Sequence, residues 1–394
     1  MKPIDWQELY ASNQAVIHGQ GRPAAGQPLP AVRRPDGTAG RLAGLRPSAN
    51  LLGAAARAAG LRPLAHLPGA AGRGVALPRL PDIEGADVLG GALTPLGDIE
   101  GADGRTAFVH VPDDLPATPV PLVVMLHGCT QTAASLAAGT LMDRTADRHG
   151  FVVAYPQQSA RHNPQACWNW FRADQLRRGA PEPAFIAGVA RAAMAAGSGW
   201  AIDPGRVFVA GMSAGGAMAT IAAACYPDLF AAVAVHSGLA YGSATNQGAA
   251  FSAMSRGAAD PGALGAAAHA AMGPHARALP TMVVHGSADR TVCPVNGEQV
   301  LAQSMAARRL AAQPDDDADP ARPTATQLGR VEGGYAYTRR SWTGGDGRPL
   351  HEHLEVEGLG HAWSGGAAGG SYTDPRGPSA SDAIWAFFSA VAGG

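Results

Sequence analysis

Five short apolar runs, separated by helix-like stretches, constrain the fold of this chain more than any other feature of its sequence. Such runs are typical of strands covered on both faces of a sheet, whereas residues 106–111 alternate as an edge strand does. The apolar runs are residues 122–126, 151–155, 207–210, 232–235 and 281–284. The helix-like stretches are residues 135–148, 184–197, 214–225, 298–312 and 380–391. This alternation predicts an α/β fold in which helices flank a mostly parallel central sheet.

The beginning of the chain differs in composition from the rest. The sequence has 52 glycines and 31 prolines among 394 residues, and residues 1–85 are rich in alanine, glycine, proline and arginine without a sustained apolar period. Such a composition predicts a loosely structured N-terminal extension. We therefore expect one large folded domain over residues 86–394.

Charge and hydropathy exclude two classes of partner. The formal net charge is −1 and there is no long basic stripe, so nucleic acid is not an expected partner. No window approaches 18 uninterrupted apolar residues, so we expect no membrane span. The spacing of the four cysteines does not match a zinc site, and we expect neither a metal nor an organic cofactor. No feature of the sequence points to a particular oligomeric state.

A glycine-flanked serine directly follows the apolar run at residues 207–210. Residues 211–215, Gly-Met-Ser-Ala-Gly, match the nucleophile-elbow motif and lead into a helix of small residues. The motif needs small neighbours because its serine occupies a strained turn where the helix passes close to the strand. The helix N-terminus also brings N–H groups to the place where negative charge develops. We predict that Ser213 is a nucleophile; a bystander serine in a glycine turn is the alternative.

A serine nucleophile needs a base, and the base needs a third group to orient it. In this kind of sheet the partners follow the serine in the order Asp or Glu, then His. Asp289 lies shortly after the run at 281–284, and His361 follows a short strand expected at 354–356. Both residues leave the carboxyl edge of the sheet, where the sites of open α/β sheets form, so we predict them as the partners of Ser213.

The other histidines near the expected strands are weaker candidates. His285 precedes a glycine turn and is expected to pack or to form hydrogen bonds, and His236 lies at a strand end. His351 and His353 flank polar positions on a strand that we expect to be exposed. His127 is expected to have a structural rather than a catalytic role.

An acyl-transfer site also needs N–H donors for the oxyanion, each commonly contributing about 3–4 kcal/mol. One donor is expected to be the amide of Ala214, directly after the nucleophile. The other is expected to be the amide of Cys129, in the loop after residues 122–126, where Gly128 lets the backbone approach closely. Four pieces of one site thus occur in the required order along the chain.

Taken together, these residues resemble the polyhydroxybutyrate depolymerase-type esterases of the α/β-hydrolase superfamily. The resemblance covers about residues 103–391 and rests on motifs that are long and uncommon. The motifs are His127-Gly128-Cys129-Thr130-Gln131, Tyr155-Pro156-Gln157-Gln158, Cys167-Trp168-Asn169-Trp170-Phe171, residues 211–216, Tyr226-Pro227-Asp228-Leu229-Phe230, Asp289 with Val292, and Gly360-His361-Ala362-Trp363. The resemblance implies a serine esterase that hydrolyses short-chain polyhydroxyalkanoate (3-hydroxybutyrate) esters, oligomers or polymer, with Ser213, Asp289 and His361 as its catalytic triad.

Two other functions are to be weighed against this one. The same group includes feruloyl and acetylxylan esterases, so a carboxylesterase acting on plant-wall or small soluble esters is the alternative. A non-catalytic binding protein is the rival from another class, which an intact Ser213, Asp289 and His361 disfavour. Secreted depolymerases usually carry a polymer-binding domain after the catalytic one, whereas this chain ends at Gly394, so we expect soluble oligomers or small esters rather than crystalline polymer.

The resemblance implies an extracellular location, in which disulfides persist. Residues 1–6 lack the basic and apolar regions of a secretory signal, so a cytoplasmic location is the alternative. Cys129 and Cys167 are both expected at the edge of the site and are the favoured disulfide pair. Cys293 also lies near that edge, so a Cys129–Cys293 pairing stays open, whereas Cys225 lies far along the helix after Ser213.

Three tryptophans are candidates for contact with the substrate. Trp168 and Trp170 lie in the loop region after residues 151–155, where they form either a wall for the apolar part of the substrate or the packing of that loop. Trp363 lies two residues from His361, and we expect it at the rim of the pocket.

Overall fold

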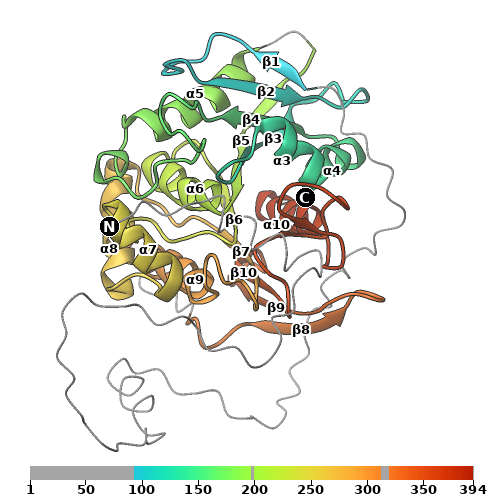
Figure 1. Cartoon of the computed structure of the whole chain (residues 1–394). Helices are drawn as coiled ribbons and strands as arrows, with labels where there is room; N and C mark the ends of the chain where they lie inside the picture. The colour runs from blue at the N-terminus through green and yellow to red at the C-terminus, as the bar shows by residue number, and fades with distance from the viewer. Residues whose placement is uncertain (1–92, 197–198, 312–318, 394) are drawn as a thin grey trace, which may run out of the picture. The chain divides into compact units, whose positions relative to one another are not determined.

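The computed structural model describes residues 93–196, 199–311 and 319–393 of the chain (Figure 1). The loosely structured extension expected over residues 1–85, and the start of the folded domain expected at residue 86, lie outside the described residues.

A ten-stranded sheet forms the centre of the described chain, in the order β1-β2-β4-β3-β5-β6-β7-β10-β9-β8. The strands are β1 Thr94–Leu96, β2 Thr106–His110, β3 Val120–Leu126, β4 Val152–Gln157, β5 Ile202–Met212, β6 Ala232–His236, β7 Thr281–Gly286, β8 Ala325–Arg330, β9 Ala336–Thr343 and β10 Pro349–Val356. The six adjacent strands β4-β3-β5-β6-β7-β10 pair with one another in parallel. The strands β2 and β1 on one side, and β9 and β8 on the other, each pair antiparallel with their neighbours. The expectation of a mostly parallel sheet flanked by helices is confirmed.

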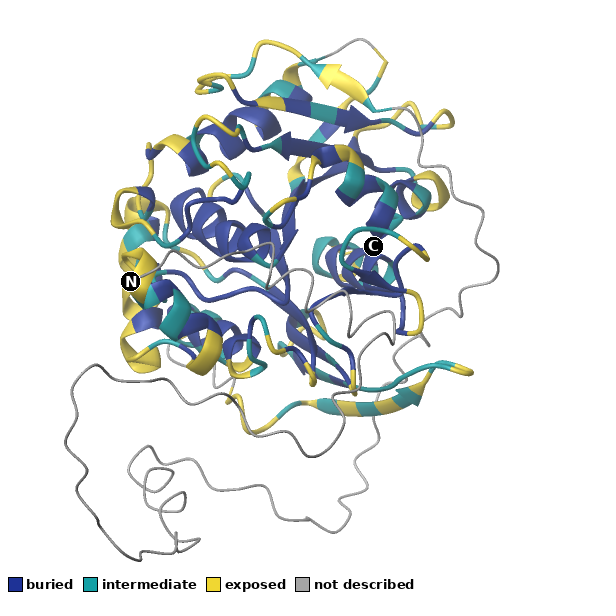
Figure 2. Cartoon of the chain, viewed as in Figure 1, coloured by how far each residue is buried: buried dark blue, intermediate teal, exposed yellow. Residues whose placement is uncertain are grey.

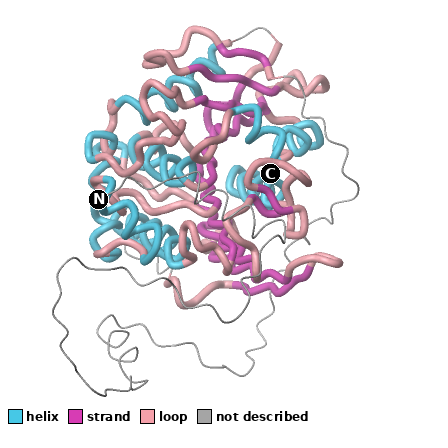
Figure 3. Tube along the Cα trace, in the orientation of Figure 1, coloured by secondary structure: helices cyan, strands magenta, loops and turns pink. Residues whose placement is uncertain are grey.

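Helices cover both faces of this sheet, as Figure 3 shows with the strands in a band between two groups of helices. Strand β3 is buried along its whole length because alternate side chains enter different cores: Leu122 and Val124 enter one, Val123 and Met125 the other. One core is built on α5 Pro181–Ala195, α6 Ala214–Cys225, α7 Gln247–Arg256, α8 Pro261–Met272 and α9 Val295–Ala311. The other is built on α3 Ala133–Thr140, α4 Met142–His149 and α10 Ala380–Ala392.

Two of the differences between the expected and the observed elements concern one helical stretch and one edge of the sheet. The single helix expected over residues 135–148 is two helices, α3 and α4, which meet at Leu141, whose φ of 58° is left-handed. The hydroxyl of Thr132 caps α3 by accepting a hydrogen bond from the Ser135 N–H. Residues 106–111 were expected to form an edge strand, but β2 lies inside the sheet because the three-residue strand β1 pairs with its outer side.

The expectation that His351 and His353 lie on an exposed strand is wrong. Strand β10 lies between β7 and β9, so that both histidines are buried. Burial lowers the pKa of His351 to about 3, because the charged imidazolium would lose its hydration. The neighbouring Glu352 is buried too, and its carboxylate is paired with the Arg339 guanidinium at 2.7 Å. Figure 2 shows this interior place of β10, whereas β8 alternates between exposed and half-buried residues.

A second, two-stranded sheet follows the main one near the end of the chain. Its parallel strands are β11 Trp363–Ser364 and β12 Thr373–Asp374, and the loop between them follows His361. Short 3-10 helices occur at η1 Ala173–Gln175 and η2 Gly273–His275. Among the described helices, none has the length and apolar character needed to cross a membrane.

Candidate active site

Ser213 occupies a sharp turn between β5 and α6. Its backbone has φ 57° and ψ −121°, a left-handed conformation that is uncommon and strained for a residue with a side chain. The turn requires glycine at its neighbours: a Cβ on Gly215 would lie 2.1 Å from the carbonyl oxygen of Leu126, and a Cβ on Gly211 would lie 2.4 Å from Gly215. The Ser213 N–H donates to the carbonyl of His236 at 2.9 Å, which ties the turn to the end of β6.

Asp289 and His361 meet at the same edge of the sheet as Ser213. Asp289 follows β7 and His361 follows β10, and these two strands are parallel neighbours whose carboxyl ends lie side by side. The His361 Nδ1–H donates to Asp289 Oδ2 at 2.7 Å, and both side chains are buried. Because a carboxylate only accepts hydrogen bonds, this contact assigns the proton of the neutral ring to Nδ1 and leaves Nε2 as its basic nitrogen.

The surroundings of Asp289 keep its carboxylate ionised. Oδ1 accepts hydrogen bonds from the backbone N–H groups of Thr291 and Val292, each at 2.9 Å. The ring of His285 lies 3.6 Å from Oδ2 and donates its Nε2–H to the carbonyl of Val292 at 2.8 Å, a hydrogen-bonding role of the kind expected for it. Burial on its own would raise the pKa of Asp289, but His361 and His285 outweigh burial and hold that pKa well below its ordinary value.

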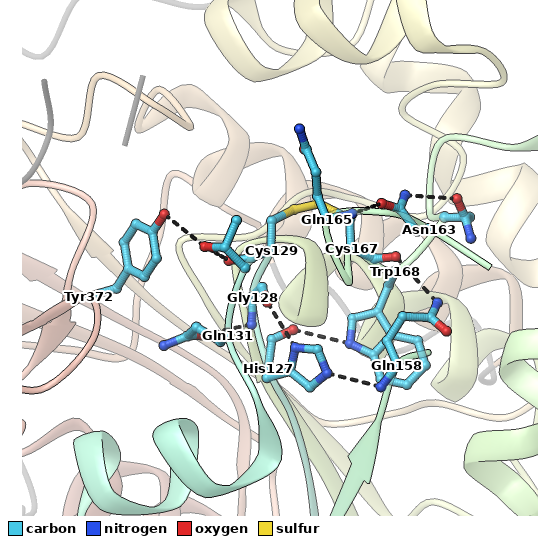
Figure 4. Close-up of a disulfide and its surroundings, with 12 residues drawn as sticks. His127, Gly128, Cys129, Gln131, Gln158, Asn163, Gln165, Cys167, Trp168 and Tyr372 are labelled. Carbon is cyan, nitrogen blue, oxygen red and sulfur yellow. Dashed lines mark hydrogen bonds between the residues drawn. A yellow bond between two sulfur atoms is a disulfide. The ribbon is translucent and has the colours of Figure 1, made fainter. Parts of the chain in front are cut away.

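The loop after β3 packs directly against the serine turn. A Cβ on Gly128 would lie 3.5 Å from the Ser213 Cβ, so the backbone of this loop approaches the nucleophile closely. A hydrogen bond within the loop stabilises its conformation: the Gly128 N–H donates to Gln131 Oε1 at 2.8 Å (Figure 4). A second hydrogen bond joins the loop to the segment after β4: the Thr130 N–H donates to the carbonyl of Gln165 at 2.8 Å.

The two amides expected to bind an oxyanion both lie at this junction. Cys129 is in the loop after β3, and Ala214 is the first residue of α6. Among the described residues, neither of these N–H groups donates to a protein acceptor. Both residues line the same cavity as Ser213, so that a developing oxyanion on a substrate in this cavity would have two donors within the site.

A disulfide joins Cys129 to Cys167, as Figure 4 shows, and this confirms the favoured pairing over a Cys129–Cys293 bond. Cys293 and Cys225 are free thiols. Since the loop that carries Cys129 is thereby linked to the segment after β4, the disulfide restrains one of the two candidate oxyanion donors.

His127 has the structural role expected for it. The ring is buried, its Nδ1–H donates to the Gly128 carbonyl at 2.8 Å, and its Nε2 accepts from the Gln158 N–H at 3.1 Å. Burial lowers the pKa of His127 to about 4, although the bond to the Gly128 carbonyl opposes this change. The ring is therefore neutral near pH 7 and braces the loop.

One cavity joins these pieces. It offers about 50 Å³ of space to the centres of water-sized groups and is partly open to solvent. Its wall contains no Asp, Glu, Lys or Arg side chain and is mainly apolar. The lining residues are Gly128, Cys129, Gln131, Trp170, Met212, Ser213, Ala214, Leu239, Met254, Thr291, Val292, His361 and Tyr372.

Of the three tryptophans considered for substrate contact, Trp170 lines the cavity, but Trp168 and Trp363 do not. Trp168 is fully buried against Phe185 and donates its Nε1–H to the His127 carbonyl at 3.1 Å. Trp363 is also fully buried, with its ring stacked at 4.7 Å on His236. Loop packing was one of the two roles expected for Trp168, and its burial fits that role. The expectation that Trp363 lies at the rim of the pocket is corrected, because its side chain is buried in the core.

Several cavity residues were not found from the sequence. Leu239 and Met254 belong to segments that carry no recognisable motif, and Tyr372 lies eleven positions after His361 in a glycine-rich loop. An aromatic residue soon after a candidate catalytic histidine was the only signal available for Tyr372. Within residues 93–196, 199–311 and 319–393, no three His, Cys, Asp or Glu side chains are grouped closely enough to hold a metal ion.

Comparison with known proteins gives a consistent result. The sequence matches the family described as Esterase PHB depolymerase over residues 107–322, more than half of the chain. It is 36% identical over 256 residues to Poly(3-hydroxyalkanoate) depolymerase C of Paucimonas lemoignei, covering 64% of this chain and 57% of that protein. It is 34% identical over 205 residues to Probable acetylxylan esterase A of Aspergillus clavatus, covering 49% of this chain and 63% of that protein.

The chain thus spans between half and two thirds of the length of these curated relatives. Among solved structures, the fold resembles that of Acetyl xylan esterase from Aspergillus awamori, with a TM-score of 0.59 and 23% sequence identity. The match covers 76% of this chain and 100% of that one. This likeness confirms the expected α/β-hydrolase architecture.

Proposed function

The chain belongs to the Esterase PHB depolymerase family, and from this premise we propose that it is a serine esterase with Ser213, His361 and Asp289 as nucleophile, base and orienting acid. One observation carries the proposal. Ser213 and His361 line a single cavity, and the His361 ring is hydrogen-bonded at 2.7 Å to the ionised Asp289.

The first half of the reaction transfers the acyl group to the enzyme. Ser213 Oγ attacks the ester carbonyl carbon while His361 Nε2 accepts the hydroxyl proton. The imidazolium that forms is stabilised by Asp289, which remains a carboxylate because its pKa lies well below the ordinary value. The amides of Cys129 and Ala214 stabilise the oxyanion, and His361 then gives its proton to the departing alcohol.

The second half repeats these steps with water. His361 takes a proton from a water molecule, whose oxygen attacks the acyl-Ser213 carbonyl, and the same two amides stabilise the second oxyanion. Collapse of this intermediate returns the proton to Ser213 and releases the carboxylic acid. Every step uses groups of this chain and water.

For the substrate, we propose short-chain hydroxyalkanoate esters, above all soluble oligomers of 3-hydroxybutyrate. The mainly apolar wall without fixed charges suits an uncharged aliphatic acyl group, and its room of about 50 Å³ suits a short one. The 36% identity to a protein named Poly(3-hydroxyalkanoate) depolymerase C supports the same class.

A second candidate is an esterase for acetyl groups on plant-wall polysaccharides. The observation that favours it is again the small cavity, because an acetyl group is the acyl group that fits it with most ease. The identity to Probable acetylxylan esterase A supports this candidate. A feruloyl group, which is an extended aromatic acid, would reach beyond this space, so the feruloyl esterase alternative needs a substrate that lies partly outside the cavity.

The test compares substrates on one enzyme preparation. We expect Ser213→Ala to abolish hydrolysis of p-nitrophenyl butyrate while its circular dichroism and melting temperature stay close to those of the wild type. Wild-type rates on 3-hydroxybutyrate trimer, acetylated xylan and methyl ferulate then separate the candidates. Faster deacetylation of xylan than cleavage of the trimer would replace the first substrate class by the second, and activity retained in Ser213→Ala would refute the nucleophile.

We further propose that the esterase domain extends over residues 86–394 and works in an oxidising, extracellular setting. The Cys129–Cys167 disulfide supports this location, because such bonds are rare in reducing compartments. Deletion of residues 1–85 is expected to leave the melting temperature and the esterase rate largely unchanged. Thiol titration of the protein from the medium and from lysates of the native cells would show where the disulfide is formed. If the protein occurs only in the lysates, with its cysteines reduced, the cytoplasmic alternative is supported.

A further inference from the structure

Tyr372 extends from the loop between β11 and β12 to the opposite side of the cavity. Its ring meets the His361 ring edge-on, with 6.2 Å between centroids and an interplanar angle of 82°. Its hydroxyl lies 3.3 Å from the Thr130 Oγ1, in the loop after β3. The side chain therefore spans the distance from the candidate base to the candidate oxyanion loop, and it lines the cavity along the way.

The direction of the Tyr372–Thr130 hydrogen bond follows from the other contact of Thr130. The Thr130 hydroxyl lies 2.6 Å from the carbonyl oxygen of Cys129, which can only accept, so Thr130 donates there. Its single proton is then used, and Tyr372 must be the donor to Thr130. A chain of two hydrogen bonds thus runs from Tyr372 through Thr130 to the main chain of Cys129.

Both partners hold their backbone in a conformation that is costly for them. Thr130 has φ 63° and Tyr372 has φ 54°, and each lies in the left-handed region that favours glycine. A second bond joins the same two loops, because Gln131 Nε2–H donates to the Ser371 carbonyl at 2.9 Å. These two strained residues thus bond each other between the loop after β3 and the loop between β11 and β12, beside the cavity that Tyr372 lines.

We propose that Thr130 and Tyr372 form a clasp that closes one side of the cavity and sets the longest acyl chain that the enzyme accepts. The proposal rests on the esterase function proposed above, and it holds for any acyl ester. The clasp limits length because the Tyr372 ring occupies the space between His361 and the Cys129 loop, and the hydrogen bond to Thr130 keeps it there. On this proposal, an acyl chain that extends toward the Tyr372 side of the cavity has to displace this ring.

The clasp is tested by the ratio of kcat/KM for p-nitrophenyl octanoate to that for p-nitrophenyl butyrate. Tyr372→Phe removes only the bond to Thr130 and is expected to raise this ratio about fivefold, the effect of one modest hydrogen bond. Thr130→Val removes this bond and the bond to the Cys129 carbonyl, and it is expected to raise the ratio at least as much. Tyr372→Ala removes the ring and is expected to raise it further. Thr130→Ser keeps a hydroxyl and is expected to restore the wild-type ratio.

Two comparisons separate a clasp from a general loosening of the site. The double variant Thr130→Val with Tyr372→Phe should have the same ratio as Thr130→Val alone, because the Tyr372 hydroxyl has no bond left to lose once the Thr130 hydroxyl is gone. Tyr335→Phe is the matched control: its hydroxyl donates to Asp374 Oδ2 at 2.9 Å beside the same small sheet, but Tyr335 does not line the cavity. This control should keep the wild-type ratio.

The proposal is overturned if Tyr372→Phe keeps the wild-type ratio, if the two single effects add in the double variant, or if Tyr335→Phe shifts the ratio equally. Should Tyr372→Ala fail to fold, the two hydroxyl-removing variants still decide the matter. If the wild type cleaves p-nitrophenyl esters but no 3-hydroxybutyrate oligomer, the proposed substrate class is wrong. The clasp can then still be tested with the same variants. A wild type that cleaves no ester refutes both proposals before any variant is made.

Discussion

His361 Nδ1 donates a 2.7 Å hydrogen bond to Asp289 Oδ2, although 72 positions separate the two residues in the chain. The contact exists because β7 and β10 are parallel neighbours, which brings the residues that follow each strand to the same edge. The candidate base and its orienting acid are thus placed by the sheet, and the loops between them are free to carry the parts that recognise a substrate.

Replacing Asp289 by asparagine is expected to lower kcat for p-nitrophenyl butyrate by about 10³–10⁴. An amide at this position presents a donor as well as an acceptor, so it favours the wrong tautomer of His361 and cannot stabilise the imidazolium. Asp203→Asn is a matched control, since Asp203 forms a half-exposed ion pair with Arg206 far along β5. Equal activity of the two variants would contradict the assignment of Asp289.

The stability of the protein should depend on Asp289 in a particular pH range. Burial raises the pKa of this carboxyl, but His361 and His285 outweigh burial, so the folded-state pKa lies below the unfolded one of about 3.9. A lowered pKa contributes to the free energy of unfolding above the unfolded value, and the contribution is lost as the pH falls through the folded value. In urea unfolding, the difference between wild type and Asp289→Asn should shrink below about pH 4. A difference that grows on acidification would contradict this sign.

Loss of the Cys129–Cys167 disulfide should affect both stability and rate. The bond closes a loop with a sequence separation of 38, for which chain entropy gives about 3–4 kcal/mol of free energy of unfolding. It also restrains the Cys129 amide. We therefore expect the double variant Cys129→Ser with Cys167→Ser to lower kcat by a larger factor than it raises KM. Cys293→Ser is the control, because Cys293 is a free thiol. Full kcat after reduction with dithiothreitol would exclude this role.

Gly215→Ala should destabilise the fold in spite of the higher helix propensity of alanine. The new Cβ would lie 2.1 Å from the Leu126 carbonyl oxygen, and backbone atoms on both sides would have to move. We expect a loss of about 3 kcal/mol or more in the free energy of unfolding, or failure to fold. Gly345→Ala is the control, because a Cβ there meets nothing within 4 Å and is expected to change stability by about 0.5 kcal/mol at most. Similar melting temperatures for both variants would show that the serine turn tolerates the methyl group.

The candidate catalytic residues could be predicted because each follows a strand that the sequence reveals by itself. Ser213 lies in a glycine turn directly after an apolar run, and Asp289 and His361 follow two later strands in the expected order. Such signals are local. They need only the rule that parallel strands bring their carboxyl ends together.

The residues that shape the cavity could not be predicted in the same way, since their positions depend on the path of long loops. Trp168 and Trp170 are two positions apart, yet Trp168 packs on the core while Trp170 lines the cavity. Both residues are tryptophans in the same short motif, so the sequence gives no reason for their different positions. His351 and His353 were expected to be exposed because they flank polar positions. The strands β8 and β9, which lie beyond β10 in the sheet, carry no continuous apolar run that would reveal them in the sequence.

The interior place of β10 also gives the site an order of assembly during synthesis. Ser213 and Cys129 emerge from the ribosome early, but His361 reaches them only after β10 has inserted between β7 and β9. Domains fold largely as they are synthesised, at about 5–20 residues per second. A nascent chain that still lacks β10 therefore carries the candidate nucleophile without the candidate base, and the site is complete only after this strand has joined the sheet.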